Sequence, residues 1–460
     1  MKIIIAGCGK IGITLVENLV NEGHEVVALD SNSDAITDIT NVYDAMGVCG
    51  SATDCDTLAE AGVEKADLFV AATDADELNM LSCFLARRMG AAHAIARIRK
   101  PEYNDQNLGF MRQQLDLSMS INPEQLAAQE LFKVLKLPSA MTVETFSRRN
   151  FEMVELRLRP ESSMDGLSLS ELRKKYAAKF LVCVVQRGEE VYIPDGNFVL
   201  RAGDRIGVTA TPTEIHRFLR MVGVMQKQAK SVMILGASRM AYYLAKMLLD
   251  NGTTVKIIDQ DRDRCRQFCD LLPGATMIHG ESIQQELLLE EGIGSVDAFV
   301  ALTGIDEENV LIGMYIRKTW PKVKVITKVN RTSFQSIIDS MDLGSVFNPR
   351  NSASNLICRY VRAMQNSESS SQIETLYKLV GGKAEALEFR VSEGSKLCGI
   401  PLQELKLREN LLIGCIGRGG QIIIPSGQDT IEPGDSVIVV TCSMGLGKLE
   451  DILARGPGHE

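Results

Sequence analysis

The sequence lacks both a hydrophobic run long enough to cross a membrane and an excess of positive charge. No uninterrupted apolar stretch among its 460 residues approaches the roughly 18 to 20 residues that a membrane span needs. The net charge of −9 argues against a protein that binds nucleic acid regardless of base sequence, since such a protein needs a basic face. The N-terminus enters an apolar run at once, so we expect no signal peptide. We therefore expect a cytoplasmic protein, held by another protein if it works at a membrane.

Histidine is scarce and the cysteines follow no framework. None of the five histidines stands in a pattern with an acid that would suit acid–base catalysis. The eleven cysteines, an odd number, show no disulfide or metal-ligand spacing, which indicates reduced cysteines that mostly lie in the interior. We expect no catalytic residues and no metal site. An NAD-dependent oxidoreductase remains an alternative on the nucleotide-binding features described next.

One stretch, residues 2–30, carries a binding motif. An apolar run precedes a G-x-G-x-x-G turn, a helical pattern follows it, and a second apolar run ends in an acid. This order of strand, glycine turn, helix, strand and acid is typical of a dinucleotide-binding unit. The residues of the motif are Gly7, Cys8, Gly9, Lys10, Ile11, Gly12 and Asp30.

Each position of the motif has a chemical reason. Gly7 permits the tight turn, Gly9 leaves room for a pyrophosphate to approach the backbone, and Gly12 lets the helix pack closely on the strand. The free N–H groups and the dipole at the helix start attract phosphate. Asp30 can accept hydrogen bonds from ribose hydroxyls and would repel a 2′-phosphate. The motif therefore favours NAD or an adenosine nucleotide over NADP.

Strands and helices continue to alternate up to Arg97, which predicts a parallel sheet with right-handed crossovers. Ligands of such sheets bind outside the carboxyl ends of the strands. Further candidates at these ends are Ser51, Ala52, Thr73, Asp74 and Arg97. From about residue 151 the pattern changes to short alternating strands, turns and a short helix, which predicts a small α+β module.

The second half of the chain repeats the first. Gly7 precedes Asp30 by 23 positions, and Gly236 precedes Asp259 by the same 23. Further matched pairs are Thr73 with Thr303, Asn79 with Asn309, Arg97 with Lys328, Asn122-Pro123 with Asn348-Pro349, and Gly203-Asp204 with Gly434-Asp435. The sequence therefore consists of one duplicated unit with small insertions. We expect the helices after Pro123 and Pro349 to be crossover or contact elements between the nucleotide domains.

The two copies differ in their glycine turns. Ser238 stands where the first copy has Gly9, and its side chain crowds the backbone that would meet a pyrophosphate. We therefore expect the first site to bind the nucleotide strongly. We expect the second site to bind the nucleotide weakly, to bind a smaller ligand, or to have only a structural role. Its candidate residues are Gly236, Ala237, Ser238, Arg239, Met240 and Asp259.

These features predict an α/β chain with two Rossmann-like, doubly wound parallel-sheet domains, each followed by a small α+β domain. The expected ranges are 1–122 and 230–348 for the nucleotide domains, 123–150 for crossover or linker helices, 349–375 for a crossover helix and flexible linker, and 151–225 and 376–457 for the small domains.

The arrangement resembles the peripheral regulatory subunits of Trk-type potassium uptake systems, which are built from tandem RCK (KTN) domains. The resemblance covers nearly the whole chain. It rests on GCGKIG from Gly7, Asp30, GSATD from Gly50, AATDADELN from Ala71, Ala96-Arg97, and the two Gly-Asp turns of the small modules. It implies a non-enzymatic, peripheral protein at the inner face of the cell membrane.

The resemblance also implies ligands and partners. NAD(H), ATP and ADP would bind the nucleotide domains, and a tetramer-like homo-oligomeric ring would dock under a membrane-embedded potassium-translocating subunit and gate it. Residues 7–11 would line the phosphates, Asp30 the ribose, and Ser51 and Ala52 the adenine, with Thr73 and Asp74 by the far end of the ligand. Arg97 would approach a phosphate. Clustered acids near Asp74 and Asp306 leave a divalent-cation-sensing ring as an alternative.

Overall fold

The computed structural model describes residues 1–100, 103, 105–137, 140, 142–146, 151–176, 179–223, 228–281, 285–330, 341, 343–368, 373–380, 383–442, 446 and 448–454. Within these ranges, no helix is both long enough and apolar enough to cross a lipid bilayer. The chain divides into two compact units, and each unit draws segments from both halves of the sequence. Unit 1 comprises Met1–Leu131 and Lys230–Val361, and unit 2 comprises Phe132–Ala229 and Arg362–Glu460.

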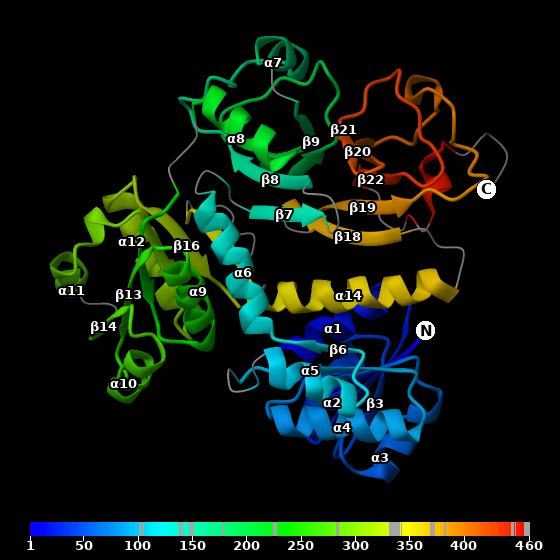
Figure 1. The fold of residues 1–460 in the computed structure, drawn as a ribbon, viewed down its shortest axis with the longest axis vertical. Helices are drawn as coiled ribbons and strands as arrows, with labels where there is room; N and C mark the ends of the chain where they lie inside the picture. Colours follow the sequence, from blue (N-terminus) through cyan, green and yellow to red (C-terminus); the bar gives the residue numbers. More distant parts are fainter. Residues whose placement is uncertain are drawn as a thin grey trace. The chain divides into compact units, whose positions relative to one another are not determined.

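Unit 1 contains, among its described residues, two parallel sheets with the same strand order. The first, whose outer strands β3 and β6 are labelled in Figure 1, has the order β3-β2-β1-β4-β5-β6. This is the order of a doubly wound dinucleotide-binding sheet. Its strands are β1 (Lys2–Ala6), β2 (Glu25–Asp30), β3 (Met46–Cys49), β4 (Leu68–Ala71), β5 (His93–Arg97) and β6 (Met119–Ile121). Its helices are α1 (Lys10–Asn21), α2 (Ser33–Val42), α3 (Cys55–Glu60), the short 3-10 helix η1 (Val63–Lys65), α4 (Asp76–Met89), α5 (Asp105–Gln114) and α6 (Pro123–Lys136).

The second parallel sheet repeats the first, with the order β14-β13-β12-β15-β16-β17. Its strands are β12 (Ser231–Leu235), β13 (Thr254–Asp259), β14 (Thr276–His279), β15 (Ala298–Ala301), β16 (Lys324–Lys328) and β17 (Ser345–Phe347). The accompanying helices are α9 (Arg239–Asp250), α10 (Arg262–Leu271), α11 (Gln285–Glu290), η2 (Ile293–Ser295), α12 (Asp306–Thr319) and α14 (Pro349–Glu368). The predicted fold class and its duplication are confirmed.

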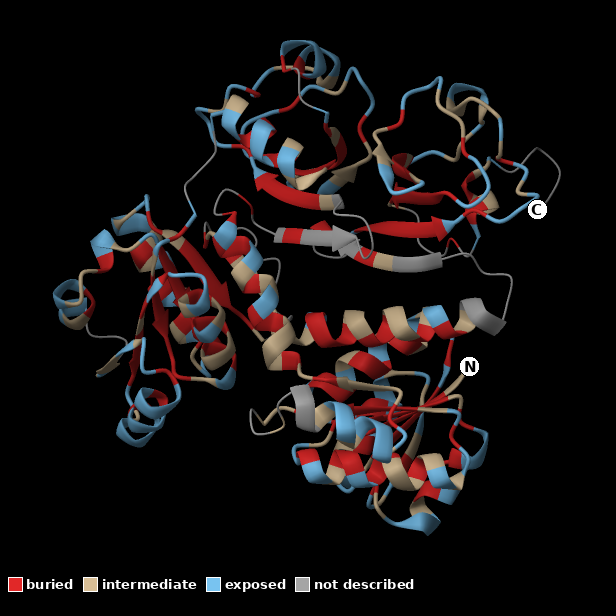
Figure 2. Ribbon diagram, viewed as in Figure 1, coloured by how far each residue is buried: buried red, intermediate tan, exposed pale blue. Residues whose placement is uncertain are grey.

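The central strands form because they are apolar without interruption, as parallel strands covered on both faces must be. All four residues of β4 are buried, and so is every residue of β15. Helix α1 buries Ile11, Leu15 and Leu19, which recur at helical spacing on one face. Figure 2 shows the consequence, since the central strands of both parallel sheets are buried while the helices alternate between buried and exposed residues.

Unit 2 contains two antiparallel sheets with the orders β10-β9-β11-β8-β7 and β18-β19-β22-β20-β21. The first module consists of β7 (Thr142–Phe146), β8 (Phe151–Arg157), α7 (Leu169–Lys175), β9 (Leu181–Arg187), β10 (Glu190–Tyr192), β11 (Arg205–Ala210) and α8 (Pro212–Met221). The second consists of β18 (Ile373–Leu379), β19 (Ala384–Arg390), η4 (Leu402–Glu404), β20 (Leu411–Arg418), β21 (Gln421–Ile423), β22 (Ser436–Thr441) and η5 (Leu449–Ile452).

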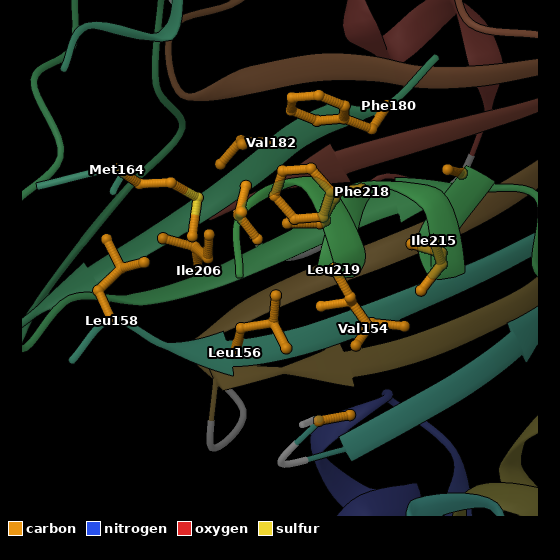
Figure 3. Packing of buried hydrophobic residues seen from close by; sticks show 14 of the residues in the cluster. Val154, Leu156, Leu158, Met164, Phe180, Val182, Ile206, Ile215, Phe218 and Leu219 are labelled. Carbon is orange, nitrogen blue, oxygen red and sulfur yellow. The ribbon is translucent and has the colours of Figure 1, made fainter. Parts of the chain in front are cut away.

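The core of the first small module lies between its sheet and helix α8. Ile215, Phe218 and Leu219 of α8 pack on Val154 and Ile206 of the sheet (Figure 3). A separate apolar cluster joins the two modules, with Met153, Cys183 and Val184 from the first and Ala386, Cys415, Ile438 and Val440 from the second. The two modules therefore share a hydrophobic core within unit 2.

The Gly-Asp turns of the small modules each hold an arginine. Asp204 is buried and accepts two hydrogen bonds from Arg187, at 2.8 and 2.7 Å. Asp435 accepts the equivalent pair from Arg418, at 3.0 and 2.8 Å. Bidentate pairs of this kind fix orientation as well as adding energy. The repeated turn thus positions the end of one strand against the start of another.

Within unit 1, the two copies touch through the helices that follow Pro123 and Pro349. Ser354 of α14 accepts a hydrogen bond from Asn18 of α1 at 2.7 Å, and Figure 1 shows α14 lying along α1. Ser352 of α14 donates to Glu130 of α6 at 2.8 Å. In addition, the Tyr243 hydroxyl of α9 donates to the Arg99 carbonyl at 3.0 Å. The expectation that these helices form contacts between the nucleotide domains is confirmed for α14.

Some elements differ from the expected organisation. Strand β7 lies inside 123–150, which we expected to be helical, because it pairs with β8 across the sheet. Strand β18 begins at Ile373 for the same reason, inside the expected range of the flexible linker. Helix α14 extends to Glu368, so residues 366–368 are helical, and residues 369–372 of that linker lie outside the described part. Helix α5 was not predicted from the sequence.

Candidate nucleotide sites

The first glycine turn packs too closely for side chains at two of its three glycines. Gly7 has φ +96°, and a Cβ there would lie 2.6 Å from the Thr73 nitrogen at the end of β4. A Cβ on Gly12 would lie 2.0 Å from the Gly7 carbonyl oxygen. These contacts confirm the expected reasons for both glycines, namely a left-handed turn and close packing of α1 on the sheet.

Gly9 is different, because the space around it is open. A Cβ at this position would meet no atom within 4 Å, and its backbone is extended. Gly9 is the N-cap of α1 and makes no side-chain capping bond. The first-turn N–H groups of α1 therefore receive no side-chain cap from this position. Such groups, with the helix dipole, can bind a phosphate that approaches over Gly9.

Asp30 connects the glycine turn to the end of β2. Its carboxylate accepts a hydrogen bond from the Cys8 N–H at 2.6 Å and another from the Asn32 N–H at 2.8 Å. A carboxylate has about four lone-pair sites, so two remain for ribose hydroxyls. The acid is half-buried beside the turn, where a ribose attached to a bound phosphate would lie.

The Cys8 thiol is buried and lies 3.7 Å from the Leu29 carbonyl oxygen, to which it donates. Burial, and secondarily the negative charge of Asp30, raises the pKa of Cys8 to about 12. The thiol therefore stays protonated at neutral pH and is a poor nucleophile. Its position in the turn is that of a small apolar filler, while its backbone N–H holds Asp30.

The edge formed by the ends of β4 and β5 is held by Asn79, a residue that the sequence did not suggest as part of the site. Its buried side chain accepts from the Thr73 N–H at 2.8 Å and the Thr73 hydroxyl at 2.6 Å. It also donates to the Thr73 carbonyl at 3.1 Å and to the Arg97 carbonyl at 2.9 Å. One side chain thus fixes Thr73 and Arg97 relative to each other. The repeat of this asparagine as Asn309 was the available sequence signal.

Arg97 is largely buried, but its ion pairs are long. Its guanidinium lies 3.9 Å from Asp74 and 3.7 Å from Glu124, and only 11 % of its side chain is exposed. Burial, with a contribution from the nearby charge of Arg99, lowers the pKa of Arg97. A buried guanidinium with distant counter-charges gains from an incoming phosphate. Asp74 itself is fully exposed, so its carboxylate is available to solvent.

The remaining predicted residues of the first site divide into exposed and buried positions. Lys10 is exposed at the start of α1, and its positive charge adds to the burial that lowers the pKa of Lys328 in the second copy. Ser51 is exposed after β3 and its hydroxyl lies 3.0 Å from that of Thr53, whereas Ala52 is buried. Ile11 packs inward with the core face of α1. Ile11 and Ala52 therefore contribute packing, while Lys10 and Ser51 face solvent.

The second turn keeps the geometry of the first but caps its helix. Gly236 has φ +94° and approaches Thr303 as Gly7 approaches Thr73. Ser238 is the N-cap of α9, and its hydroxyl accepts from the Ala241 N–H at 3.3 Å. One N–H that the first site leaves uncapped is therefore already bonded here. Ala237 and Met240 are buried and Arg239 begins the helix.

Asp259 repeats the bonds of Asp30 and adds an ion pair. It accepts from the Ala237 N–H at 2.6 Å and the Asp261 N–H at 2.8 Å. Its Oδ2 also lies 3.5 Å from Nη1 of Arg264, a residue that the sequence did not single out. Only 6 % of Asp259 is exposed. The acid of the second site is thus more enclosed than that of the first.

Three of the acids that suggested a divalent-cation site, Asp76, Glu77 and Asp306, are engaged in protein contacts. Asp76 accepts from the N–H groups of Arg99 and Lys100, and Glu77 pairs with Lys100. Asp306 accepts both the backbone and side-chain N–H of Asn330. In the part of the chain that the structure describes, no group of three or more His, Cys, Asp or Glu residues could hold a metal ion.

Comparison with known proteins identifies the repeated domains. The TrkA-N domain model matches residues 3–110 and 232–349, and the TrkA-C domain model matches residues 153–223 and 386–454. The Trk system potassium uptake protein TrkA homolog of Archaeoglobus fulgidus is 31 % identical over 98 % of this chain and 100 % of its own. The TrkA protein of Haemophilus influenzae is 29 % identical over 95 % of both chains.

Among solved structures, a GsuK channel bound to NAD is similar in fold. Its TM-score is 0.61 and its sequence identity 16 %, over 98 % of this chain and 77 % of that one. The same tandem architecture is therefore present in a channel structure, although identity at this level speaks only for the fold.

Proposed function

Since the chain belongs to the TrkA family of potassium uptake proteins, a non-enzymatic family with tandem TrkA-N and TrkA-C domains, we propose that it is a nucleotide-binding regulatory subunit that gates a membrane potassium uptake transporter. The observation that carries the proposal is the first site. This site combines three features: the N-terminus of α1 without a side-chain cap, open space around Gly9, and the Asp30 carboxylate where a ribose would lie.

The ligands of this site are NAD(H) and the adenine nucleotides ATP and ADP. Asp30 accepts ribose hydroxyls and repels a 2′-phosphate, which excludes NADP. Lys10 and Arg97 distinguish a charged terminal phosphate from a nicotinamide, because only the phosphate gains from two nearby cations. The GsuK channel, which shares the fold and was solved bound to NAD, supports the first of these ligands.

Regulation requires that the ligands prefer different conformations. A ligand shifts a conformational equilibrium only by its differential affinity for the two states. A terminal phosphate that binds Arg97 displaces the ends of β4 and β5, which Asn79 links by hydrogen bonds. A nicotinamide carries no such charge and does not displace them. The proposed readout is a change in a homo-oligomeric, tetramer-like ring. It docks at the cytoplasmic face of the membrane on a Trk-type potassium-translocating subunit and gates it.

The test is calorimetric binding of NADH, NAD, ATP and ADP to the intact chain, to Asp30→Ala and to Asp259→Ala. Loss of a carboxylate that bonds two ribose hydroxyls weakens binding about 10- to 100-fold. We expect this loss for Asp30→Ala and little change in the tight site for Asp259→Ala. Potassium flux through the reconstituted transporter then follows occupancy of the first site. Absence of binding to the wild-type chain would refute the proposal.

A further inference from the structure

The second site differs from the first at the start of the helix that follows its ribose acid. Asp30, Asn32 and Ala35 of the first copy correspond, at a constant spacing, to Asp259, Asp261 and Arg264 of the second. Both trios end in the first turn of a helix, α2 in one case and α10 in the other. The substitution of alanine by arginine places a guanidinium where the first site has only a methyl group.

The Arg264 guanidinium is held in place by two acids. Its Nε and Nη2 lie 3.2 and 3.1 Å from Oδ2 of Asp261, and its Nη1 lies 3.5 Å from Oδ2 of Asp259. The Arg264 backbone N–H and guanidinium together lower the pKa of Asp261, so that carboxylate stays charged. Yet 49 % of the Arg264 side chain is exposed. A planar cation with a free face therefore lies directly beside the ribose acid.

The neighbouring strand offers a second planar side chain. His279 pairs in register with Asp259, and its Nε2 lies 3.1 Å from the Gln260 carbonyl oxygen. In the first copy the residue opposite Asp30 is Cys49. The outer rim of the second site thus presents an imidazole and a guanidinium, whereas the first presents a thiol and a methyl group.

We propose that Arg264 is the specificity-determining residue of the second site, which binds adenine mononucleotides through the base and phosphates rather than through the ribose. This inference rests on the proposed nucleotide-binding function. Arginine stacks well on aromatic rings, and the adenine of a bound nucleotide lies next to its ribose. Asp259 already has Arg264 as a partner, so a ribose hydroxyl adds little there.

The phosphate end of the second site agrees with a small ligand. Ser238 takes up the Ala241 N–H, so the helix start offers fewer free donors than α1 does. A mononucleotide needs fewer N–H donors at the helix start than the pyrophosphate of a dinucleotide does. The two sites of one chain therefore differ in ribose selectivity: the first discriminates against 2′-deoxynucleotides, and the second tolerates them.

The experiment isolates the second site with Gly9→Val. Because Gly9 is extended and a Cβ there meets no protein atom within 4 Å, the valine occupies ligand space at the first site without disturbing the fold. ADP and 2′-deoxy-ADP are then titrated calorimetrically into the full chain. We expect one ADP per chain, with 2′-deoxy-ADP binding within about threefold of it. In the Gly9→Val background, Arg264→Ala and Arg264→Lys each weaken ADP about tenfold, since lysine keeps the charge but not the planar face.

The matched control is Arg262→Ala, which removes the same charge from an exposed position of the same helix and leaves binding unchanged. In a chain with only Arg264→Ala, the remaining tight site is the first, and 2′-deoxy-ADP binds there about tenfold more weakly than ADP. The inference would be overturned if the ratio of the dissociation constants for 2′-deoxy-ADP and ADP were the same at both sites. It would also be overturned if Arg264→Ala left the affinity for ADP unchanged or raised it.

The two proposals fail in different ways. If the wild-type chain binds ADP but Gly9→Val binds none, the second site is not a nucleotide site and only this inference falls. If the wild-type chain binds no nucleotide, the proposed function falls with it. Thermal unfolding of each variant identifies any loss of binding that comes from misfolding.

Discussion

Asn79→Ala tests whether the ends of β4 and β5 must be fixed for the first site to bind a nucleotide. The buried amide makes four hydrogen bonds, three to Thr73 and one to the Arg97 carbonyl. Alanine leaves the Thr73 N–H, the Thr73 carbonyl and the Arg97 carbonyl without this partner. These groups are partly buried, and each costs about 1 kcal/mol when unsatisfied, so we expect a loss of about 3 kcal/mol of unfolding free energy.

The effect on binding follows from the residues that Asn79 holds. When Thr73 and Arg97 are no longer fixed to each other, the guanidinium must be ordered by the ligand itself, which consumes binding energy. The loss corresponds to about one charge-assisted hydrogen bond, so ADP binding at the first site weakens at least about tenfold. Urea denaturation measures the stability change, and calorimetry at a temperature where the variant is fully folded measures the affinity.

The duplicated chain provides its own control. Asn309 makes the same bonds to Thr303 and to the Lys328 carbonyl in the second copy. Asn309→Ala should therefore lower stability by a similar amount and leave the first site unchanged. The reasoning is refuted if both variants weaken the first site equally, or if Asn79→Ala binds ADP as tightly as wild type.

Four further predictions follow from individual contacts. Gly12→Ala should shift α1 away from the turn and weaken nucleotide binding at the first site in calorimetry, because its Cβ would lie 2.0 Å from the carbonyl oxygen of the first glycine. The second copy accommodates alanine at this position, so the helix should still form. Ala241→Gly, the reverse change in the second copy, should cost only about 1 kcal/mol of helix stability in urea denaturation. The buried Cys8 thiol should resist iodoacetamide at pH 8 in the native chain, as its pKa of about 12 implies; mass spectrometry showing rapid alkylation would contradict this. The pKa of Glu77 is lowered to about 2, chiefly by its hydrogen bond to Lys100. Since a lowered pKa stabilises the folded state above the unfolded value, this contribution should disappear as pH falls from about 4.5 toward 2, and Glu77→Gln should flatten the measured stability profile across that window.

The glycine turn shows what local sequence can predict. A left-handed φ at Gly7 and close packing at Gly12 depend on residues within a few positions along the chain, so the strand–turn–helix order was sufficient to assign both. The acids at the ends of β2 and β13 follow from the same local order. The alternation of apolar runs and helical patterns likewise determined the parallel sheets, since its periods are local.

Unpredicted elements and contacts came from pairing over long distances in sequence. Strand β7 forms because β8 offers it an edge to pair with. The sequence showed the Gly-Asp turn but not the bidentate pair of Arg187 with Asp204, because nothing in the turn indicates which residue will bind the acid.

The sequence by itself determined that the chain is a duplicated unit with two Rossmann-like domains and unequal glycine turns, because glycine, serine and acid positions act through their own backbones. From this difference the sequence predicts a stronger first nucleotide site. Only the tertiary structure decided that Asn79 ties two strand ends together and that Arg264 pairs with Asp259. Hydrogen bonds and ion pairs act over a few ångströms, and which side chains come within that range depends on how the strands and helices pack.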